Sequence, residues 1–147
     1  MNNRFKQYYM DIAKRTAEMS RARKLKVGCI AVKDDKILSS GWNGTPAGWD
    51  NNCEDVIQLE DPELGEMLKT KPEVIHAEMN CLMKLARSTE SGEGAAIFIT
   101  HSPCIECAKG IYQAGIKTVY YTDEYRSDAG INFLEKCGIT IERLDEK

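Results

Sequence analysis

The sequence predicts an α/β protein with three αβα layers, in which helices cover both faces of a five-stranded mixed sheet. Two observations support this fold class. In the second half of the chain, short apolar strands alternate with amphipathic helical segments, which implies parallel strands joined by right-handed crossovers. In the first half, two strand patterns are separated only by a short polar turn, which favours an antiparallel hairpin.

Length and composition set limits on the kind of protein. The chain is expected to form one domain over residues 1–147, which is long enough to bury a hydrophobic core. A net charge of −3 argues against a long nucleic acid as partner, because such partners usually require a basic face. No apolar run approaches the ~20 residues of a membrane span, so no membrane partner is expected. Six cysteines without a secretory signal indicate reduced thiols and a cytoplasmic location.

The first half of the chain should contain one helix and one hairpin. The helix is predicted from apolar or small residues at helical spacing, namely Phe5, Tyr8, Tyr9, Ile12, Ala13, Thr16 and Met19. The hairpin strands are expected at 27–32 and 36–40, joined by the polar turn 33–35. Residues 41–75 hold four glycines and three prolines, so we expect mainly loop there, with a short helix near 63–69.

The second half should supply three strands and three helices. A helix is expected to begin at His76, because Met79, Leu82, Met83 and Ala86 follow at helical spacing. A strand at 95–100 then leads to a helix that begins at Cys104. The remaining elements are a strand at 118–121, a helix at 129–137 and a strand at 140–144.

One pattern of residues indicates a catalytic metal site. His76 and Glu78 are followed 25 residues after Glu78 by Pro103, with Cys104 and Cys107 directly behind it. One imidazole and two thiolates can hold zinc and leave one position open for water, whose pKa zinc lowers from ~15.7 to around 7. The Glu78 carboxylate could then move protons between the water, a ring nitrogen and a leaving amino group. This H-x-E…P-C-x-x-C order is typical of zinc-dependent nucleobase deaminases.

The expected helix starts favour the same site. His76 and Cys104 each lie where a helix should begin, and Pro103 is a common residue at such a start. Two helix N-termini directed at one metal ion would place partial positive charge beside the thiolates and lower their pKa.

Two other uses of these residues stay open from the residues alone. A closed structural zinc would need a fourth ligand, for which Cys29, Cys53, Cys81, Cys137 and His101 are available. A redox pair would need only the C-x-x-C motif. Both alternatives leave the position of Glu78 unexplained.

Nearly the whole chain resembles the deoxycytidylate (dCMP) deaminases of the cytidine-deaminase superfamily. The resemblance is carried by residues 27–32, 40–48, 76–80, 100–109 and 113–116. The G-x-N-G-x-P segment that begins at Gly41 distinguishes this family from tRNA-adenosine, free-cytidine and polynucleotide deaminases. Trp42 stands where the family usually has tyrosine. A second, structural zinc of some members is not expected, because the chain from Cys53 to residue 75 has one cysteine and no histidine.

The resemblance implies a fold, a reaction and a form of regulation. The fold would be cytidine deaminase-like. The reaction would convert dCMP and water to dUMP and ammonia with one catalytic Zn²⁺ per chain, supplying dUMP for thymidylate synthesis. Similar proteins are commonly homohexamers that dCTP activates and dTTP inhibits, with Mg²⁺ accompanying the triphosphates.

The resemblance also implies nucleotide contacts. Asn43 would hydrogen-bond the nucleotide, and the backbone N–H of Ala77 would meet the pyrimidine carbonyl. Tyr125 and Arg126 would lie in a loop suited to the 5′-phosphate. Each assignment has a plainer alternative, since Asn-Gly is a turn signal and 125–126 could be an ordinary surface loop.

Candidate effector or phosphate contacts form a second group. They are Trp42, Gly44, Arg23, Lys24 and Arg87. Glycines at 41, 44 and 48 could let backbone approach a triphosphate, and the Trp42 ring offers a flat face for a base or a neighbour. The alternatives are an ordinary glycine-rich loop and solvated cations near helix ends.

Two other functions compete with dCMP deamination. The same chemistry could act on dCTP, a free nucleoside or a nucleic-acid base. The chain could also be a non-catalytic zinc-binding regulatory module, although the presence of Glu78 beside a complete ligand set argues against this.

Overall fold

A computed structural model describes residues 1–145 and contains the predicted five-stranded mixed sheet. The strand order is β2-β1-β5-β6-β7. Strand β1 pairs antiparallel with β2 and β5, whereas β5, β6 and β7 run parallel. The bounds of the strands are β1 (Gly28–Lys33), β2 (Lys36–Trp42), β5 (Ala96–His101), β6 (Thr118–Asp123) and β7 (Thr140–Arg143).

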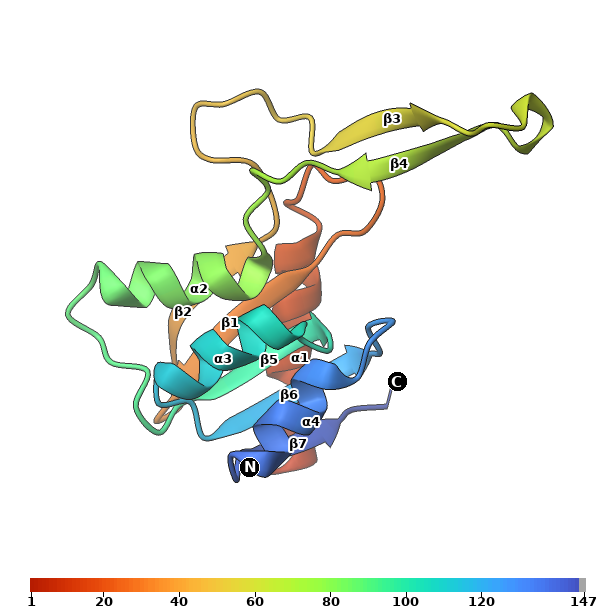
Figure 1. Cartoon of the computed structure of the whole chain (residues 1–147). Helices are drawn as coiled ribbons and strands as arrows, with labels where there is room; N and C mark the ends of the chain where they lie inside the picture. Colours follow the sequence, from red (N-terminus) through yellow and green to blue (C-terminus); the bar gives the residue numbers. More distant parts are fainter. Residues whose placement is uncertain (146–147) are drawn as a thin grey trace.

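Helices cover both faces of this sheet, as predicted. Helix α1 (Asn3–Ala17) packs on one face, where Met10, Ile30 and Phe98 are fully buried. The other face carries α2 (Ala77–Ala86), α3 (Ile105–Gln113) and α4 (Ala129–Lys136), seen in front of the sheet in Figure 1. These three helices share a second core that includes Leu82, Ile111 and Leu134. None of the helices within residues 1–145 is long and apolar enough to cross a bilayer.

The region expected to be mainly loop instead contains a second, two-stranded sheet. Strands β3 (Glu54–Gln58) and β4 (Glu66–Thr70) pair antiparallel and project from the body of the molecule (Figure 1). We call residues 54–70 the arm. A single 3₁₀ turn, η1 (Pro62–Leu64), lies between the strands. The predicted helix at 63–69 is therefore wrong.

The physical reason for this correction lies at Gly65. Its φ of +78° is a left-handed conformation that ends the helical turn and sends the chain into β4. Pairing of Val56 with Leu68 and of Ile57 with Met67 then fixes the second strand. A seven-residue segment is too short for periodicity to separate a helix from a strand, so the cross-strand contacts decide.

Strand β2 also runs further than expected. It includes Gly41 and Trp42, where the sequence favoured a loop. A Cβ at Gly41 would lie 2.5 Å from the Ala77 carbonyl oxygen and 2.5 Å from the Cys81 nitrogen. The missing side chain therefore lets β2 approach α2 closely, which gives Gly41 a structural role. A triphosphate contact at Gly41 stays a prediction.

Candidate active site

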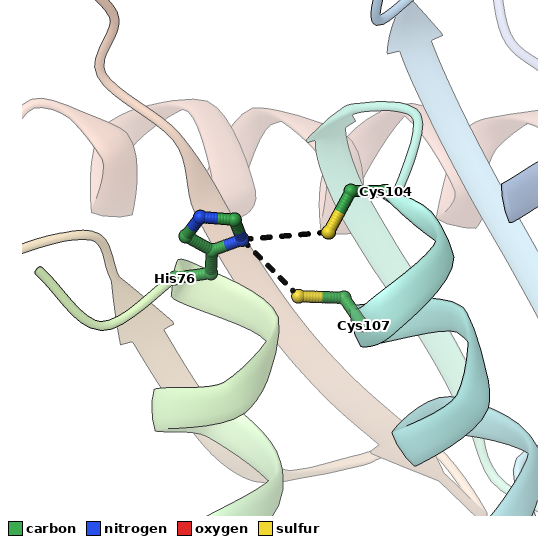
Figure 2. Close-up of side chains that lie close together, drawn as sticks. All are labelled: His76, Cys104 and Cys107. Carbon is green, nitrogen blue, oxygen red and sulfur yellow. Dashed lines mark hydrogen bonds between the residues drawn. The ribbon is translucent and has the colours of Figure 1, made fainter. Parts of the chain in front are cut away.

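The three expected zinc ligands come together at the starts of α2 and α3. His76 is the N-cap of α2, Cys104 is the N-cap of α3, and Cys107 lies in the first turn of α3. Figure 2 shows the His76 Nδ1 atom facing both sulfurs, 3.6 Å from Cys104 Sγ and 3.3 Å from Cys107 Sγ. Zn–S bonds of about 2.3 Å and Zn–N bonds of about 2.0 Å at tetrahedral angles require an N···S separation of about 3.6 Å. The donor set and its spacing thus fit Zn²⁺.

Residues 1–145 offer no fourth His, Cys, Asp or Glu ligand atom within 4.8 Å of all three members of this group. Within residues 1–145, the three side chains form the only set of His, Cys, Asp or Glu ligand atoms that all lie within 4.8 Å of one another. The cysteines considered for a closed site lie elsewhere. Cys29 and Cys81 are fully buried in the core, Cys53 precedes the arm, and Cys137 ends α4. A three-ligand site with an open position therefore fits better than a closed structural zinc.

The two thiols contact each other, and the contact makes one of them more acidic than the other. Hydrogen bonds from Cys107 and His76 lower the pKa of Cys104 to about 4, and the same contact with Cys104 raises the pKa of Cys107. Both sulfurs lie at helix N-termini, where the backbone favours negative charge. A divalent cation would displace the remaining protons, because only the thiolate coordinates.

Glu78 is placed for proton transfer. It is the second residue of α2, only 5% exposed, and lines the pocket beside His76. Burial raises the pKa of its carboxyl from 4.5 to about 7. A group with such a pKa can both accept and return a proton near neutral pH.

The site opens into a pocket of about 760 Å³, a volume suited to a small-molecule ligand. One wall comes from the C-terminal ends of the neighbouring parallel strands β5 and β6 and the loop that follows β6. Tyr125 and Arg126 lie in this wall, as expected for ligand contacts. The backbone N–H of Tyr125 donates to the buried Ser102 hydroxyl at 2.6 Å, so Ser102 fixes where the loop begins.

His101 also lines this wall, whereas the sequence indicates it only as a possible fourth zinc ligand. Its Nδ1 lies 3.1 Å from the Thr100 hydroxyl, and its Nε2 lies 3.5 Å from Asp123 Oδ2. Burial lowers the pKa of the imidazole, so the ring is held neutral near pH 7. The sequence feature that indicates a pocket position for His101 is its place three residues before Cys104, at the end of a predicted strand.

The opposite wall is built from the loop before β1 and the base of the arm. Lys24, Asn43, Lys69 and Lys71 are among its residues. The sequence does not indicate Lys69 or Lys71 as pocket residues, because Lys69 falls in the segment where a helix is expected and Lys71 in an expected loop. Arg23 is not part of the pocket lining, since its guanidinium faces Asn52 and Glu54.

Asn43 lies at the pocket, and its side chain holds backbone there. Its Oδ1 accepts from the Val27 N–H at 2.9 Å, and its Nδ2 donates to the Leu25 carbonyl at 2.8 Å. The amide keeps one further N–H and one further lone pair for a ligand. The structure thus gives Asn43 a bracing role in addition to its position at the pocket.

The remaining candidate effector residues lie outside the pocket lining. The Lys84 ammonium sits 5.2 Å from the centre of the Trp42 ring. Gly44 forms an isolated antiparallel bridge with Ile75, and Arg87 is the C-cap of α2. Gly44 thus lies beside the residue that precedes His76, whereas Lys24 lines the same pocket as the metal ligands His76 and Cys104.

Comparisons with known proteins place the chain in a family. Residues 3–123 match the model of the cytidine and deoxycytidylate deaminase zinc-binding region. The chain is 36% identical to human deoxycytidylate deaminase over 96% of this chain and 80% of the human protein. It is 30% identical to the deoxycytidylate deaminase of enterobacteria phage T4 over 94% of this chain and 89% of that protein.

A solved structure gives the same result in three dimensions. The dCMP deaminase of cyanophage S-TIM5, crystallised in complex with dCMP and dUMP, is 44% identical and superposes with a TM-score of 0.86. The match covers 98% of this chain and 99% of the cyanophage chain. Agreement of motif, fold and sequence over nearly the full length leads to one conclusion: the chain belongs to the cytidine and deoxycytidylate deaminase family.

Proposed function

We propose that the protein hydrolyses dCMP to dUMP and ammonia and so supplies dUMP for thymidylate synthesis. The observation that carries this proposal is a three-ligand zinc site beside a buried carboxyl group, at one end of a pocket whose other end bears cations. The relatives support the substrate, because two are named deoxycytidylate deaminases and a third was crystallised with dCMP and dUMP.

The chemistry at the metal end follows from the residues there. His76, Cys104 and Cys107 would hold one Zn²⁺ per chain. When bound, zinc lowers the pKa of a coordinated water and makes it a nucleophile near neutral pH. Glu78 takes a proton from the attacking water and delivers it to the ring nitrogen beside the reacting carbon. It then takes the second proton of the same water from the hydroxyl group on the reacting carbon and passes it to the departing amino group. The C–N bond breaks as the carbonyl forms, so that water and dCMP give dUMP and ammonia.

Backbone at the start of α2 can hold the base. Ala77 is the first residue of this helix and lines the pocket. The first N–H groups of a helix have no partner within the helix, so the Ala77 N–H is suited to the pyrimidine carbonyl oxygen. Tyr125 on the facing wall offers an aromatic ring of the right size to cover the base.

The cations of the pocket are suited to a 5′-phosphate. Lys24, Lys69, Lys71 and Arg126 line its walls, and Arg126 lies in the same loop as Tyr125. A monophosphate carries nearly two negative charges near neutral pH, which these side chains would balance. This arrangement favours a nucleotide over a free nucleoside.

A panel of substrates tests the proposal. Turnover should be measured on dCMP, dCTP, deoxycytidine and a deoxycytidine oligonucleotide under one set of conditions. We expect kcat/KM for dCMP to exceed the value for deoxycytidine by at least ~100-fold, as for other sites that recognise a charged group. Equal values would show that no phosphate site exists, and faster turnover of dCTP would assign the protein to the competing substrate. No turnover of any member by zinc-loaded protein would favour the regulatory module.

We propose in addition that dCTP activates and dTTP inhibits an oligomeric form of the enzyme, a hexamer being the expected assembly. The end of β2 and the glycine-rich segment that follows it support a separate effector site, because Trp42 and Gly44 are only partly buried and lie outside the pocket lining. Mg²⁺ would accompany the triphosphates, and an effector would act through its different affinities for two arrangements of the oligomer.

Steady-state kinetics test this regulation. The rate should depend sigmoidally on dCMP, become hyperbolic with dCTP and Mg²⁺, and fall with dTTP. Trp42→Ala should weaken both responses while zinc content stays unchanged. Hyperbolic kinetics indifferent to both triphosphates, together with a monomer by light scattering, would remove the regulatory proposal and leave the catalytic one intact.

A further inference from the structure

Glu54 is a buried carboxylate that the chemistry does not use. It opens strand β3 at the base of the arm, and its side chain is 1% exposed. A charged group is rarely buried to this degree unless it is paired and hydrogen-bonded. Its contacts therefore indicate what the group does.

Those contacts tie the loop before β1 to the arm. One carboxylate oxygen, Oε2, accepts from the backbone N–H of Arg23 at 3.0 Å and of Lys24 at 3.1 Å. The other, Oε1, lies 3.5 Å from Arg23 Nε and accepts no hydrogen bond within residues 1–145. Glu54 is among the residues that line the pocket, but this unpaired oxygen is covered by protein.

The residue before Glu54 also holds the backbone of a second pocket cation, Lys71. The Lys71 backbone N–H donates to the Cys53 carbonyl at 2.8 Å, directly before Glu54. Lys24 and Lys71 both line the pocket. One short stretch, residues 53–54, thus holds the backbone of two pocket lysines that are 47 positions apart in the sequence.

We propose that Glu54 is a positioning residue for the phosphate end of the nucleotide, acting through the backbone of Lys24 and the base of the arm. The proposal rests on the proposed function, because it requires a phosphorylated substrate. It adds a role for a residue of the pocket lining that is not one of the metal ligands.

The direction of the change in KM for dCMP distinguishes this positioning role from simple electrostatic repulsion between Glu54 and the phosphate. A carboxylate near the phosphate repels it, so removing the charge alone would strengthen nucleotide binding. Removing the brace would instead let Lys24 move and would weaken binding. The two explanations predict opposite changes in KM for dCMP.

Three variants test the proposal, with kcat and KM measured on both dCMP and deoxycytidine. Glu54→Ala removes both backbone contacts, and we expect KM for dCMP to rise about tenfold, the size typical of lost charge-assisted hydrogen bonds. Glu54→Gln keeps an acceptor oxygen and should raise KM about threefold, because neutral hydrogen bonds are weaker. Glu60→Gln removes an exposed carboxylate of the same arm and should change nothing.

Comparing kcat/KM for dCMP with kcat/KM for deoxycytidine shows whether Glu54 acts by positioning the phosphate contacts. Deoxycytidine has no phosphate, so its kcat/KM should stay within about twofold in all three variants. If its turnover is too slow to measure, inhibition by dUMP and by deoxyuridine provides the same comparison. Zinc content and thermal unfolding report on folding, and Glu54→Gln decides the outcome if Glu54→Ala does not fold.

Three results would overturn the proposal. They are a lower KM for dCMP in either Glu54 variant, an unchanged KM in both, and equal losses on the two substrates, which would indicate a general effect on folding. Equal kcat/KM values of the wild-type enzyme for dCMP and deoxycytidine would refute the proposed function itself, and the positioning role with it.

Discussion

The two ends of the pocket are built in different ways. At the metal end, the ligands and Glu78 come from the starts of two helices, and most of these side chains are at least half buried. At the other end, the cations come from the loop before β1, the arm and the loop after β6, and most of their side chains are exposed. A metal site requires ligand positions that are correct to within tenths of an ångström. A phosphate, in contrast, can be bound by several flexible cations.

This difference indicates which parts of the molecule can change without loss of the reaction. A substitution at a helix start alters the chemistry for every substrate. A substitution in the loops or the arm alters which nucleotide fits and leaves the reaction intact. The predictions below test this division, starting with the largest expected effect.

Loss of a ligand should abolish metal and activity together. Cys104→Ala or His76→Ala removes one of three protein ligands, so bound zinc and turnover should both fall below detection for dCMP and deoxycytidine alike. Elemental analysis and steady-state assays measure the two quantities. Cys137→Ala is the matched control, since that thiol lies outside the ligand group. Zinc retained by both ligand variants would show that the ligands are wrongly assigned.

Glu78→Gln should separate chemistry from metal binding. The amide keeps the size of the side chain but cannot accept and return a proton, so kcat should fall by at least ~10²–10⁴-fold on both substrates. Zinc content should equal that of the wild type, because Glu78 is not among the three ligands. Near-normal turnover by the zinc-loaded variant would exclude Glu78 as the proton carrier.

Glu78 should also make the stability of metal-free protein depend on pH. Its pKa is about 7 in the folded chain against 4.5 when unfolded, so the folded state binds more protons between these values. The wild type should therefore lose stability as pH rises from 4.5 to 7. Relative to Glu78→Gln, the loss should reach about 3 kcal/mol. Urea unfolding of both chains without metal measures it, and parallel curves across this range would contradict the shifted pKa.

Ser102→Ala should produce the smallest effect, confined to the nucleotide end. The change removes the acceptor for the Tyr125 N–H and should raise KM for dCMP about threefold, with a stability loss of about 1–2 kcal/mol. Ser127→Ala is the control, because that hydroxyl accepts from Ala129 in the same loop region, away from Tyr125. A loss in kcat as large as that of Glu78→Gln would show that the two ends are not independent.

The metal end was predictable from the sequence because its residues lie close together in the chain. His76 and Glu78 are two positions apart, Cys104 and Cys107 are three apart, and each pair opens a helix whose periodicity can be seen. The sheet was predictable for a similar reason, since its three central strands, β1, β5 and β6, are apolar and buried.

The nucleotide end was only partly predictable, because its contacts join distant segments. Arg126 is suggested by the family resemblance and Lys24 by a basic cluster in the sequence, whereas Lys71 reaches the pocket only through pairing of the arm strands. The arm itself shows little burial pattern, since Val56 and Met67 are about half exposed. Periodicity predicts structure where one face is buried, and the arm has no such face within residues 1–145.

The arm has a consequence for how the molecule can vary in length. Its base contributes to the pocket, but its tip at 61–65 does not. Side chains of a strand alternate between faces, so adding one residue to each strand would invert every contact beyond the insertion. Adding two residues to each strand would restore the faces and move the tip outward by about 6.6 Å. The reach of the arm is therefore adjustable in discrete steps of even number, without disturbing the wall that its base provides.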